Sequence, residues 1–438
     1  RLGRLHFKIW VGGKMKTFNR RQALALSATA VTGLLLASPA LGANRPKIII
    51  IGGGFGGISA ATVLKTIQPD FDITIVTETD SFSTCPFSNL VIAGLRSLKS
   101  ITFSYKNIAA QGMSIKVGKV TAIDAVKRVL SLADGSNLSF DRCIASPGIE
   151  MQFDQIPGYT EALQNLMPHA WKAGAQTLQL RDQLSSMQQG GTFIIYAPNT
   201  PYRCPVAPYE RASLVAHYFT RHNPTAKILI VDEKDSFAKQ ALFTQAWELL
   251  YPGMITHFPF SETGGIIEVD AKNLEIMTPF ENFKGDVVNF IPPQKAPQFL
   301  LQSGLSGNGL WCQIDEATFE SKHAPNIHIL GDAALVGDMP KSGFSASVQG
   351  GICAHAVASL MNGEPPKTAV LLNTCYSLVA PDYGISVAGA YRINDEGRLR
   401  SIKNTGGASS IDASDEVRKA EASYAYDWYN SLTHIMFG

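Results

Sequence analysis

The sequence predicts an α/β protein with two Rossmann-like dinucleotide-binding domains and a smaller C-terminal interface domain. Two observations carry this prediction: an apolar strand that leads into a glycine-rich turn, and a second strand-helix-strand pattern further along the chain. The chain has 438 residues, 45% hydrophobic and 17% charged, which is enough to form the cores of two or three domains. A formal net charge of +2, with no basic block among aromatic residues, argues against nucleic-acid binding.

The first strand, 47–51, is a β-branched apolar run that leads into glycines at 52, 54 and 57. In this Gly-x-Gly-x-x-Gly pattern, Gly52 allows the tight turn and Gly54 lets the backbone approach a pyrophosphate. Gly57 allows close packing of the helix expected at 58–67, whose N-terminus faces the phosphates.

A second strand, 72–77, ends at Glu78, which lies about 20 residues past Gly57 and is suited to bond ribose hydroxyls. Strand, turn, helix, strand and acid together predict a dinucleotide site. The alternative is a glycine turn used only for packing.

The cofactor is predicted to be FAD rather than NAD. A strand at 326–330 leads into Gly331 and Asp332, which resemble the second FAD signature of flavoproteins with two dinucleotide domains, where the aspartate reaches the ribityl chain. The alternative for Asp332 is an ordinary helix cap. The helix expected at 345–361 is rich in small residues, and its N-terminus would favour an anionic reduced flavin. Lys341 would add to this effect, unless it is an exposed loop lysine.

A second Rossmann-like unit is expected from a helix near 173–187, strands at 192–197 and 227–231, and a helix after Pro208. Its turn, 197–205, contains prolines and no glycine fingerprint. Prolines lack an amide donor, and side chains block the approach of the backbone to a pyrophosphate, so NADH binding is not expected.

Short strands are expected to alternate through 114–140, as in a small antiparallel meander. The segment 286–293 is expected to return the chain to the first domain. Near the C-terminus, apolar residues at helical spacing predict a stripe that packs against a domain or a partner. These residues are Val417, Ala420, Tyr424, Trp428, Leu432 and Ile435.

The N-terminal region, 1–43, is expected to be an upstream segment and an export signal. Paired arginines at 20 and 21 precede an apolar stretch, 23–37, and small residues follow it. This pattern is typical of the twin-arginine route and predicts a periplasmic protein without a membrane span in its mature chain. The alternative is an uncleaved membrane anchor.

Four stretches together resemble the flavoprotein subunit of flavocytochrome c sulfide dehydrogenase, and the likeness covers 46–438. They are Thr84-Cys85-Pro86-Phe87-Ser88-Asn89, Arg203-Cys204-Pro205 with Pro208-Tyr209-Glu210-Arg211, Met339-Pro340-Lys341-Ser342-Gly343, and Leu372-Asn373-Thr374-Cys375-Tyr376. The resemblance implies a fold of the flavoprotein disulfide reductase type. It also implies that FAD is bound covalently through its 8α-methyl group to Cys85, and that Cys204 and Cys375 form a redox disulfide facing the flavin.

Such a disulfide suits sulfide as the substrate, because hydrosulfide is a soft nucleophile that attacks disulfide sulfur. Glu210, close after Cys204, is a candidate proton acceptor, with a surface helix glutamate as the equal alternative. The remaining cysteines, Cys143, Cys312 and Cys353, are expected to be buried and inert.

The resemblance implies that electrons pass to a c-type cytochrome subunit in a heterodimer. The chain has no Cys-x-x-Cys-His, so the haem is expected on another polypeptide, and its nine histidines show no metal-ligand spacing. Two alternatives stay open: a sulfide:quinone oxidoreductase, and a non-catalytic FAD subunit that relays electrons.

The expected domain organisation has five parts. They are the upstream segment and signal (1–43), the first part of the FAD domain (44–150), the second Rossmann-like domain (151–285), the second part of the FAD domain (286–365) and the C-terminal partner and flavin-facing domain (366–438).

Overall fold

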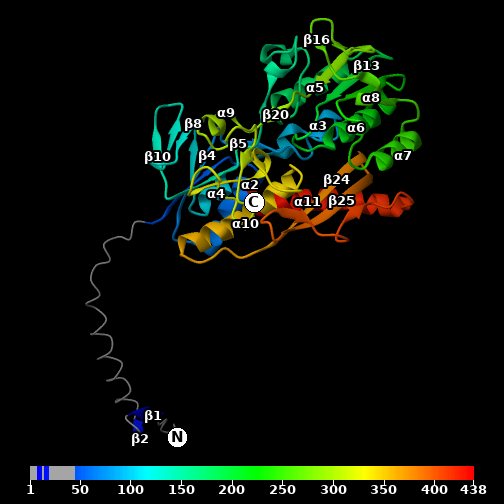
Figure 1. Cartoon of the computed structure of the whole chain (residues 1–438). Coiled ribbons are helices and arrows are strands. Elements are labelled where there is room, and N and C mark those ends of the chain that lie inside the picture. Colours follow the sequence, from blue (N-terminus) through cyan, green and yellow to red (C-terminus); the bar gives the residue numbers. More distant parts are fainter. Residues whose placement is uncertain (1–6, 12–13, 19–44) are drawn as a thin grey trace. The chain divides into compact units, whose positions relative to one another are not determined.

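The computed structural model describes residues 7–11, 14–18 and 45–438. Strands β1 (Phe7–Val11) and β2 (Lys14–Phe18) pair as an antiparallel hairpin. Residues 46–438 form one compact unit, coloured from blue to red in Figure 1, which contains all the other elements. The export signal predicted at 19–43 lies outside the described residues.

The first domain is built on a parallel sheet. In sheet order its strands are β22 (Ile327–Ile329), β11 (Arg142–Ala145), β3 (Lys47–Ile51), β4 (Asp72–Thr77) and β7 (Ser114–Val117). The four isoleucines of the central strand β3 are at most 3% exposed, because the sheet is covered on both faces. The strands and the helix predicted around the glycine turn are therefore confirmed.

Two helices pack closely beside this sheet. Helix α2 (Phe55–Ile67) starts directly after the glycine turn, three residues earlier than predicted, and α10 (Gly343–Met361) crosses it. The crossing is tight at Gly350, where an added Cβ would lie 2.3 Å from the carbonyl oxygen of Gly56. The small residues of α10 thus allow the backbones of the two helices to meet.

An antiparallel meander stands at the edge of the first domain. Its strands are β8 (Val120–Asp124), β9 (Val129–Leu132) and β10 (Asn137–Ser139). The meander was predicted to start at Ser114, which was wrong: residues 114–117 form β7 of the parallel sheet. Alternation alone does not distinguish a parallel edge strand from a meander strand.

Short elements connect the main strands and helices along the chain. They are β5 (Ser81–Ser83), α3 (Ser88–Ile92), η1 (Leu98–Ile101), β6 (Thr102–Ser104), α4 (Lys106–Ala110), β12 (Glu150–Met151), η2 (Phe153–Gln155), η3 (Glu161–Asn165), β20 (Gln294–Lys295), α9 (Gln298–Gln302), β21 (Cys312–Gln313), η4 (Gly331–Ala333) and β23 (Ala334–Leu335).

The second domain has its own parallel sheet, shown in green in Figure 1. In sheet order its strands are β15 (Ile255–Phe258), β14 (Lys227–Asp232), β13 (Thr192–Ala197) and β19 (Val287–Phe290). Its helices are α5 (Ala175–Ser186), α6 (Ala207–His222), α7 (Gln240–Leu250) and α8 (Phe260–Thr263), and a small antiparallel sheet is formed by β16 (Glu268–Asp270), β17 (Glu275–Met277) and β18 (Asn282–Lys284). The predicted fold class with two Rossmann-like domains is confirmed.

Strand β19 corrects the predicted boundary at residue 286. The segment 286–293 was assigned to the first domain, but Val287 to Phe290 pair with β13 of the second sheet. A buried, β-branched strand fits the interior of either sheet, so its pattern does not reveal which one it joins. The return to the first domain comes with β20, which pairs with β12.

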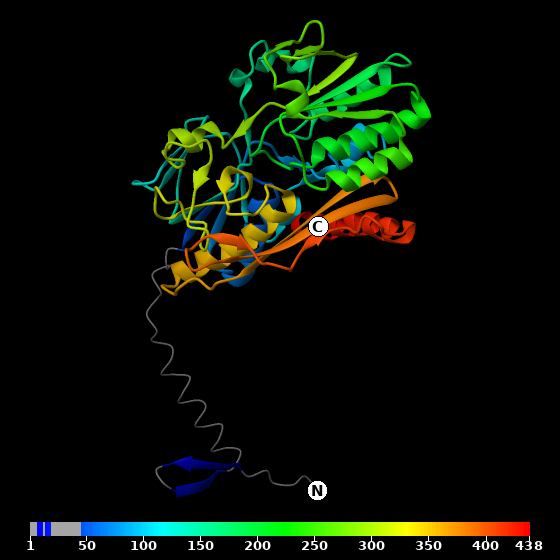
Figure 2. The ribbon, with the colours of Figure 1, turned by 45° about the vertical axis from the view of Figure 1, so that its right-hand side comes forward.

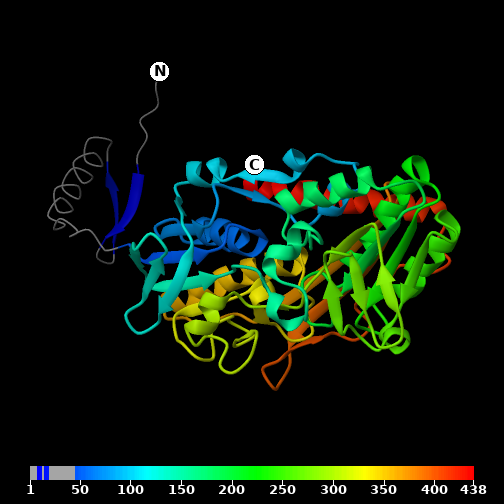
Figure 3. The same cartoon turned by 90° about the horizontal axis from the view of Figure 1, so that it is seen from above.

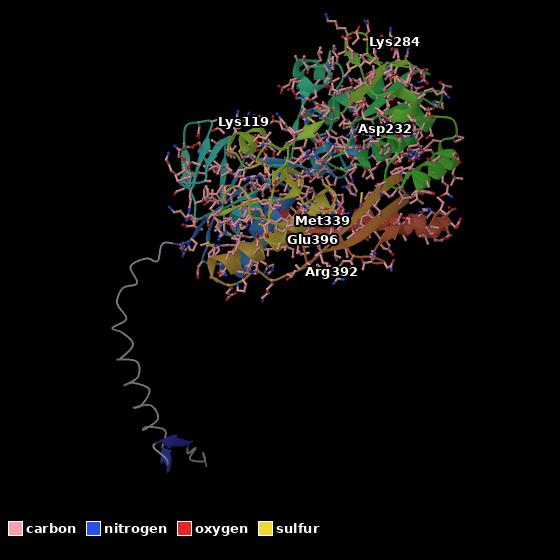
Figure 4. The ribbon with its side chains drawn as sticks, viewed as in Figure 1. Lys119, Asp232, Lys284, Met339, Arg392 and Glu396 are labelled. Carbon is pink, nitrogen blue, oxygen red and sulfur yellow. The ribbon has the colours of Figure 1, made fainter. Side chains whose placement is uncertain are left out.

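The C-terminal region is a long hairpin backed by a helix. Strands β24 (Val370–Ala380) and β25 (Tyr383–Ile393) are antiparallel, and β26 (Leu399–Ser401) and β27 (Gly407–Ala408) both pair with β25. Figure 2 shows the hairpin in orange beneath the green helix α6, with the red helix α11 (Asp415–Phe437) running along it. In Figure 4 the labelled Arg392 lies toward the lower side of this region.

Helix α11 contacts both Rossmann-like domains. From above it extends beside elements of the first and second domains (Figure 3), and Ala422 and Ala425 share a buried cluster with Leu214 of α6. At its far end the Phe437 ring stacks on Phe103, with ring centroids 5.0 Å apart, and lies 6.1 Å from Phe82.

The predicted apolar stripe of α11 coincides only in part with its buried face. Val417, Tyr424 and Ile435 are 47%, 56% and 65% exposed. The buried face combines the small residues Ala422 and Ala425 with Tyr429, Met436 and Phe437, and an added Cβ at Gly384 of β25 would lie only 2.3 Å from the amide nitrogen of Ala422. Trp428 and Leu432 of the stripe do pack against buried clusters. The stripe is wrong as an intramolecular packing face for the three exposed residues, whose role as a partner contact stays a prediction.

The crossing of α2 and α10 yields a stability prediction. Gly350→Ala forces a methyl group against the α2 backbone, so we expect the free energy of unfolding to fall by about 1–3 kcal/mol. The matched control is Gly351→Ala, whose added Cβ meets only Val63 Cγ2 at 3.8 Å. Without a clash, the control is expected to stay within about 1 kcal/mol of wild type. Denaturant unfolding of both variants measures the difference, and equal stability would contradict this account.

Candidate functional site

Two cavities meet at Cys85. The glycine-turn cavity, about 560 Å³, follows the turn before α2 and includes Gly52, Gly54 and Glu78. The cysteine cavity, about 100 Å³, is lined by residues of both Rossmann-like domains, of the C-terminal hairpin and of α11. Both are lined by Cys85, Pro86, Arg203 and Gly343.

The glycine turn has the geometry of a phosphate cradle. Gly52 has φ +99°, and an added Cβ would lie 2.2 Å from the carbonyl oxygen of Ser146. Gly57 does not line the cavity, but a Cβ there would lie 1.9 Å from the carbonyl oxygen of Gly52, so it is needed to close the turn. Gly54 precedes α2, whose N-terminus has no side-chain cap and no acidic residue in its first turn. Its amide donors thus remain available to an anion.

Asp332 supplies the clearest sign that a polar ligand belongs here. It follows β22 in the short turn η4 and lines the glycine-turn cavity, and its Oδ1 atom is buried without a hydrogen-bond partner. Oδ2 lies 3.9 Å from the Arg203 guanidinium. Burial raises the pKa of Asp332, against the opposing charges of Arg203 and Lys341. A buried acceptor without a donor is costly, and a ribityl hydroxyl group of FAD would satisfy it.

Lys341 does not line either of these cavities. Its ammonium donates to the carbonyl oxygens of Asp332 at 2.8 Å and Ala334 at 2.6 Å, and lies 4.0 Å from the centre of the Trp311 ring. Burial lowers its pKa to about 8. Lys341 is therefore neither an exposed loop lysine nor a group beside the glycine turn: it holds the turn that carries Asp332.

The cysteine cavity brings together three cysteines from distant parts of the chain. Cys85 lies in the turn before α3, Cys204 in the loop before α6, and Cys375 in the middle of β24. All three are thiols in this structure. The structure places Cys204 and Cys375 in one cavity with Cys85, and the pairing of Cys204 and Cys375 as a disulfide stays a prediction.

Local geometry fixes Cys85 and Cys204. The Cys85 sulfur lies 3.6 Å from the carbonyl oxygen of Trp171. Cys204 has φ +55°, an unusual conformation outside glycine, and its amide donates to the carbonyl oxygen of Lys341 at 2.7 Å. Burial raises the pKa of the Cys204 thiol well above its usual range, and Cys375 and Glu210 raise it further. As a free thiol, Cys204 thus resists ionisation.

Glu210 faces the same cavity, which favours a site residue over a surface glutamate. Its Oε2 accepts from Asn89 Nδ2 at 2.8 Å, and its Oε1 accepts from the amide of Leu378 at 2.9 Å. Burial raises the pKa of Glu210 despite these two hydrogen bonds and the charges of Lys239 and Arg211, which lower it. A carboxylate with a raised pKa is a better proton acceptor than an exposed one.

Two cations of this site were not predicted as functional residues. Arg211, 1% exposed, donates only to neutral oxygens and lies over the Trp171 ring, and burial lowers its pKa to about 9. Lys239, 9% exposed, contacts Cys375. Arg211 belongs to one of the four stretches that resemble flavocytochrome c sulfide dehydrogenase, and this membership is only a weak indication of a functional role. Nothing in the sequence around Lys239 distinguishes it from a loop lysine.

In the second domain, the acidic residue that corresponds to Glu78 is already bonded to neighbouring side chains. This residue is Asp232, labelled in Figure 4, which is the last residue of β14. Glu78 stands at the equivalent place in the first domain, directly after β4. The Asp232 carboxylate accepts hydrogen bonds from Tyr209 Oη at 2.5 Å and from Lys234 Nζ. It also forms a hydrogen bond with His257 Nε2 at 3.0 Å. A ribose would have to replace these partners.

Two further properties concern the described residues alone. None of the helices in this part of the chain is long and apolar enough to cross a membrane. Within the same ranges, no three His, Cys, Asp or Glu side chains are grouped so as to hold a metal ion.

Family models match three segments of the chain. A pyridine nucleotide-disulphide oxidoreductase model matches 46–186, the central model of the sulfide dehydrogenase [flavocytochrome c] flavoprotein chain matches 177–292, and a flavocytochrome c sulphide dehydrogenase flavin-binding model matches 367–437.

Curated relatives include sulfide-oxidising flavoproteins. The mitochondrial sulfide:quinone oxidoreductase of Mus musculus is 22% identical over 344 residues, 74% of this chain and 73% of the relative. A sulfide dehydrogenase [flavocytochrome c] flavoprotein chain from Chlorobaculum thiosulfatiphilum is 44% identical over 45 residues, 10% of this chain and 94% of the relative.

Solved structures show the same fold. The sulfide:quinone oxidoreductase of Aquifex aeolicus matches with a TM-score of 0.66 at 12% identity, covering 89% of this chain and 92% of that one. Putidaredoxin reductase, in its covalent complex with putidaredoxin, matches with a TM-score of 0.63 at 14% identity, covering 89% and 98%.

Proposed function

Because the chain belongs to the sulfide-oxidising flavoproteins, we propose that it is the FAD subunit of a flavocytochrome c sulfide dehydrogenase. In this proposal Cys204 and Cys375 form the redox disulfide, Cys85 holds FAD covalently, and the electrons pass to a c-type cytochrome. One observation carries the proposal: the cavity that holds Cys204, Cys375 and Glu210 joins the glycine-turn cavity at Cys85.

The residues of the cysteine cavity are suited to hydrosulfide. The buried Arg211 guanidinium has only neutral acceptors, so its positive charge favours a small anion in the cavity. A disulfide between Cys204 and Cys375 is an electrophile for such a soft nucleophile. Glu210, with its raised pKa, can take the proton released from the substrate sulfur.

The glycine-turn cavity is suited to FAD. The α2 N-terminus would bind the pyrophosphate, Glu78 a ribose and Asp332 the ribityl chain, with Cys85 at the junction of the cavities. When bound, FAD accepts electrons in pairs and releases them singly, which suits a haem acceptor.

A c-type cytochrome is supported as the acceptor by two family models with flavocytochrome c in their descriptions, which match the second domain and the C-terminal region. The chain has no haem attachment motif, so the haem belongs to a separate subunit. The exposed side chains of Val417, Tyr424 and Ile435 on α11 offer it an apolar contact. The paired arginines before the apolar stretch support a periplasmic location.

A quinone acceptor is the second candidate. It is favoured by the match to sulfide:quinone oxidoreductase of Mus musculus, which covers 74% of this chain. The two acceptors can be compared directly after reduction with sulfide. Fast reoxidation by ferricytochrome c with slow reoxidation by a short-chain quinone supports the cytochrome, and the reverse order supports the quinone.

The first prediction concerns the cysteine pair. Sulfide should bleach the flavin absorbance of the wild-type protein within seconds, whereas Cys204→Ser and Cys375→Ser should each slow bleaching by at least about 100-fold, because the disulfide that accepts the electron pair is missing. Stopped-flow absorbance measures this rate. Dithionite should still reduce all three proteins. A serine variant that reacts with sulfide at the wild-type rate would remove the disulfide from the mechanism.

The second prediction concerns flavin attachment. After acid precipitation, the yellow colour should stay with wild-type protein and appear in the supernatant for Cys85→Ala, because only a covalent bond survives denaturation. Absorbance of both fractions measures the distribution. The matched control is Cys312→Ala, a buried cysteine outside both cavities. Release of flavin from the wild-type protein would rule out the covalent bond.

The third prediction concerns pH. Because burial raises the pKa of Glu210, its proton-accepting carboxylate form is present above that raised pKa and is lost as pH falls through it. The rate of flavin reduction by sulfide should therefore fall on the acid side, and Glu210→Gln should remove this acid limb and lower the maximum rate by about 10- to 100-fold. Stopped-flow measurements across pH test this. An unchanged profile in Glu210→Gln would assign the limb to another group.

A further inference from the structure

Lys239 occupies a position that is unfavourable for a lysine in three ways. Its side chain is 9% exposed, its φ of +65° is rare outside glycine, and it is the N-cap of α7, where a positive charge opposes the helix dipole. Among the described residues no carboxylate forms an ion pair with it. Packing alone does not explain a buried, unpaired ammonium.

The contacts of Lys239 point to Cys375. Its Nζ donates to Ser377 Oγ at 2.8 Å and to the carbonyl oxygen of Cys375 at 3.0 Å, and lies 4.0 Å from Cys375 Sγ. The ring of Phe243 lies on another side, with its centroid 5.8 Å away. In these surroundings the charge of the ammonium is screened much less than at the surface.

Cys204 lines the same cavity from the loop before α6. Its amide is bonded to the segment that precedes α10, and the neighbouring Arg203 lines both cavities. Thr374, Cys375 and Tyr376 line only the cysteine cavity, so Cys204 is the cysteine nearer the proposed flavin attachment. The pair is therefore asymmetric, with the flavin side at Cys204 and the lysine side at Cys375.

We propose that Lys239 stabilises negative charge on the sulfur bound at Cys375, first on the incoming hydrosulfide and then on the persulfide left there. This inference rests on the proposed function for its substrate. Because Cys204 lies on the flavin side, Cys375 is the cysteine that keeps the substrate sulfur, and the Lys239 ammonium favours the anionic form of that sulfur.

The step balances in atoms and charge. The hydrosulfide sulfur forms a bond to Cys375 Sγ, and the bond between Cys375 and Cys204 breaks. The electron pair of that bond leaves with Cys204 as a thiolate, so the disulfide is reduced and the substrate sulfur is oxidised to the persulfide level. The hydrosulfide proton passes to the Glu210 carboxylate, and the persulfide anion at Cys375 faces Lys239.

The first part of the test does not depend on sulfide. In a Cys204→Ser background, the alkylation rate of Cys375 by iodoacetamide at neutral pH reports how much of it is thiolate. We expect Lys239→Met to lower this rate at least about fivefold and Lys239→Arg, which keeps the charge, to stay within about twofold. Mass spectrometry of the Cys375 peptide gives the rate. An equal rate in Lys239→Met would overturn the proposal.

The second part uses the flavin-containing protein and sulfide. We expect Lys239→Met to slow flavin reduction by sulfide at least tenfold, with dithionite reduction unchanged. The control is Lys227→Met, because Lys227 also donates to a backbone carbonyl, that of Gly253 at 2.8 Å, but is exposed.

After one turnover, trapping should find the persulfide on Cys375, and a persulfide found only on Cys204 would overturn the assignment. If sulfide does not reduce the wild-type flavin, the proposed function fails, while the alkylation rates still decide the effect of Lys239.

Discussion

The buried guanidinium of Arg211 holds the cysteine cavity together. It donates to Asn89 of α3, to Asn289 of β19 and to the carbonyl oxygens of His169 and Ala170. These acceptors come from three separate stretches of the chain, in both Rossmann-like domains. Without the guanidinium, Asn89 Oδ1, Asn289 Oδ1 and the Ala170 carbonyl oxygen would lose their donor, and only the His169 carbonyl oxygen would keep one, from Asn289 Nδ2. Burying acceptors without a donor is far costlier than losing an exposed contact. The cavity walls therefore depend on one side chain of α6.

The same strand-turn-helix architecture is used in two different ways. In the first domain the turn is open at Gly52 and Gly54, and Glu78 borders the cavity. In the second domain, prolines stand in the turn and Asp232 is bonded to Tyr209, Lys234 and His257. The loop before α6 then presents Cys204 to the cavity between the domains. In the second domain, the end of the sheet where a nucleotide would bind is therefore filled by side chains, and the loop there carries Cys204 instead.

Periodicity and glycine spacing predicted the main strands and helices of the two Rossmann-like sheets, because these patterns depend on neighbours along the chain, but they did not predict the C-terminal hairpin of β24 and β25. They did not predict that Val287 to Phe290 join the second sheet, since a buried strand fits either sheet. The packing face of α11 was missed because the helix approaches Gly384 through small residues and leaves large apolar ones exposed. Lys239 could not be predicted, because its proximity to Cys375 exists only in the folded chain.

The contact between Phe437 and the first domain has a consequence for biosynthesis. Phe82 and Tyr105 line the glycine-turn cavity, and both lie near the Phe437 ring, with centroids 6.1 and 6.3 Å away. Asn107 also donates to the carbonyl oxygen of Phe437 at 2.6 Å. These aromatic walls gain their outer support only after residue 437 has left the ribosome. Until residue 437 has been synthesised, the glycine-turn cavity lacks this outer aromatic support.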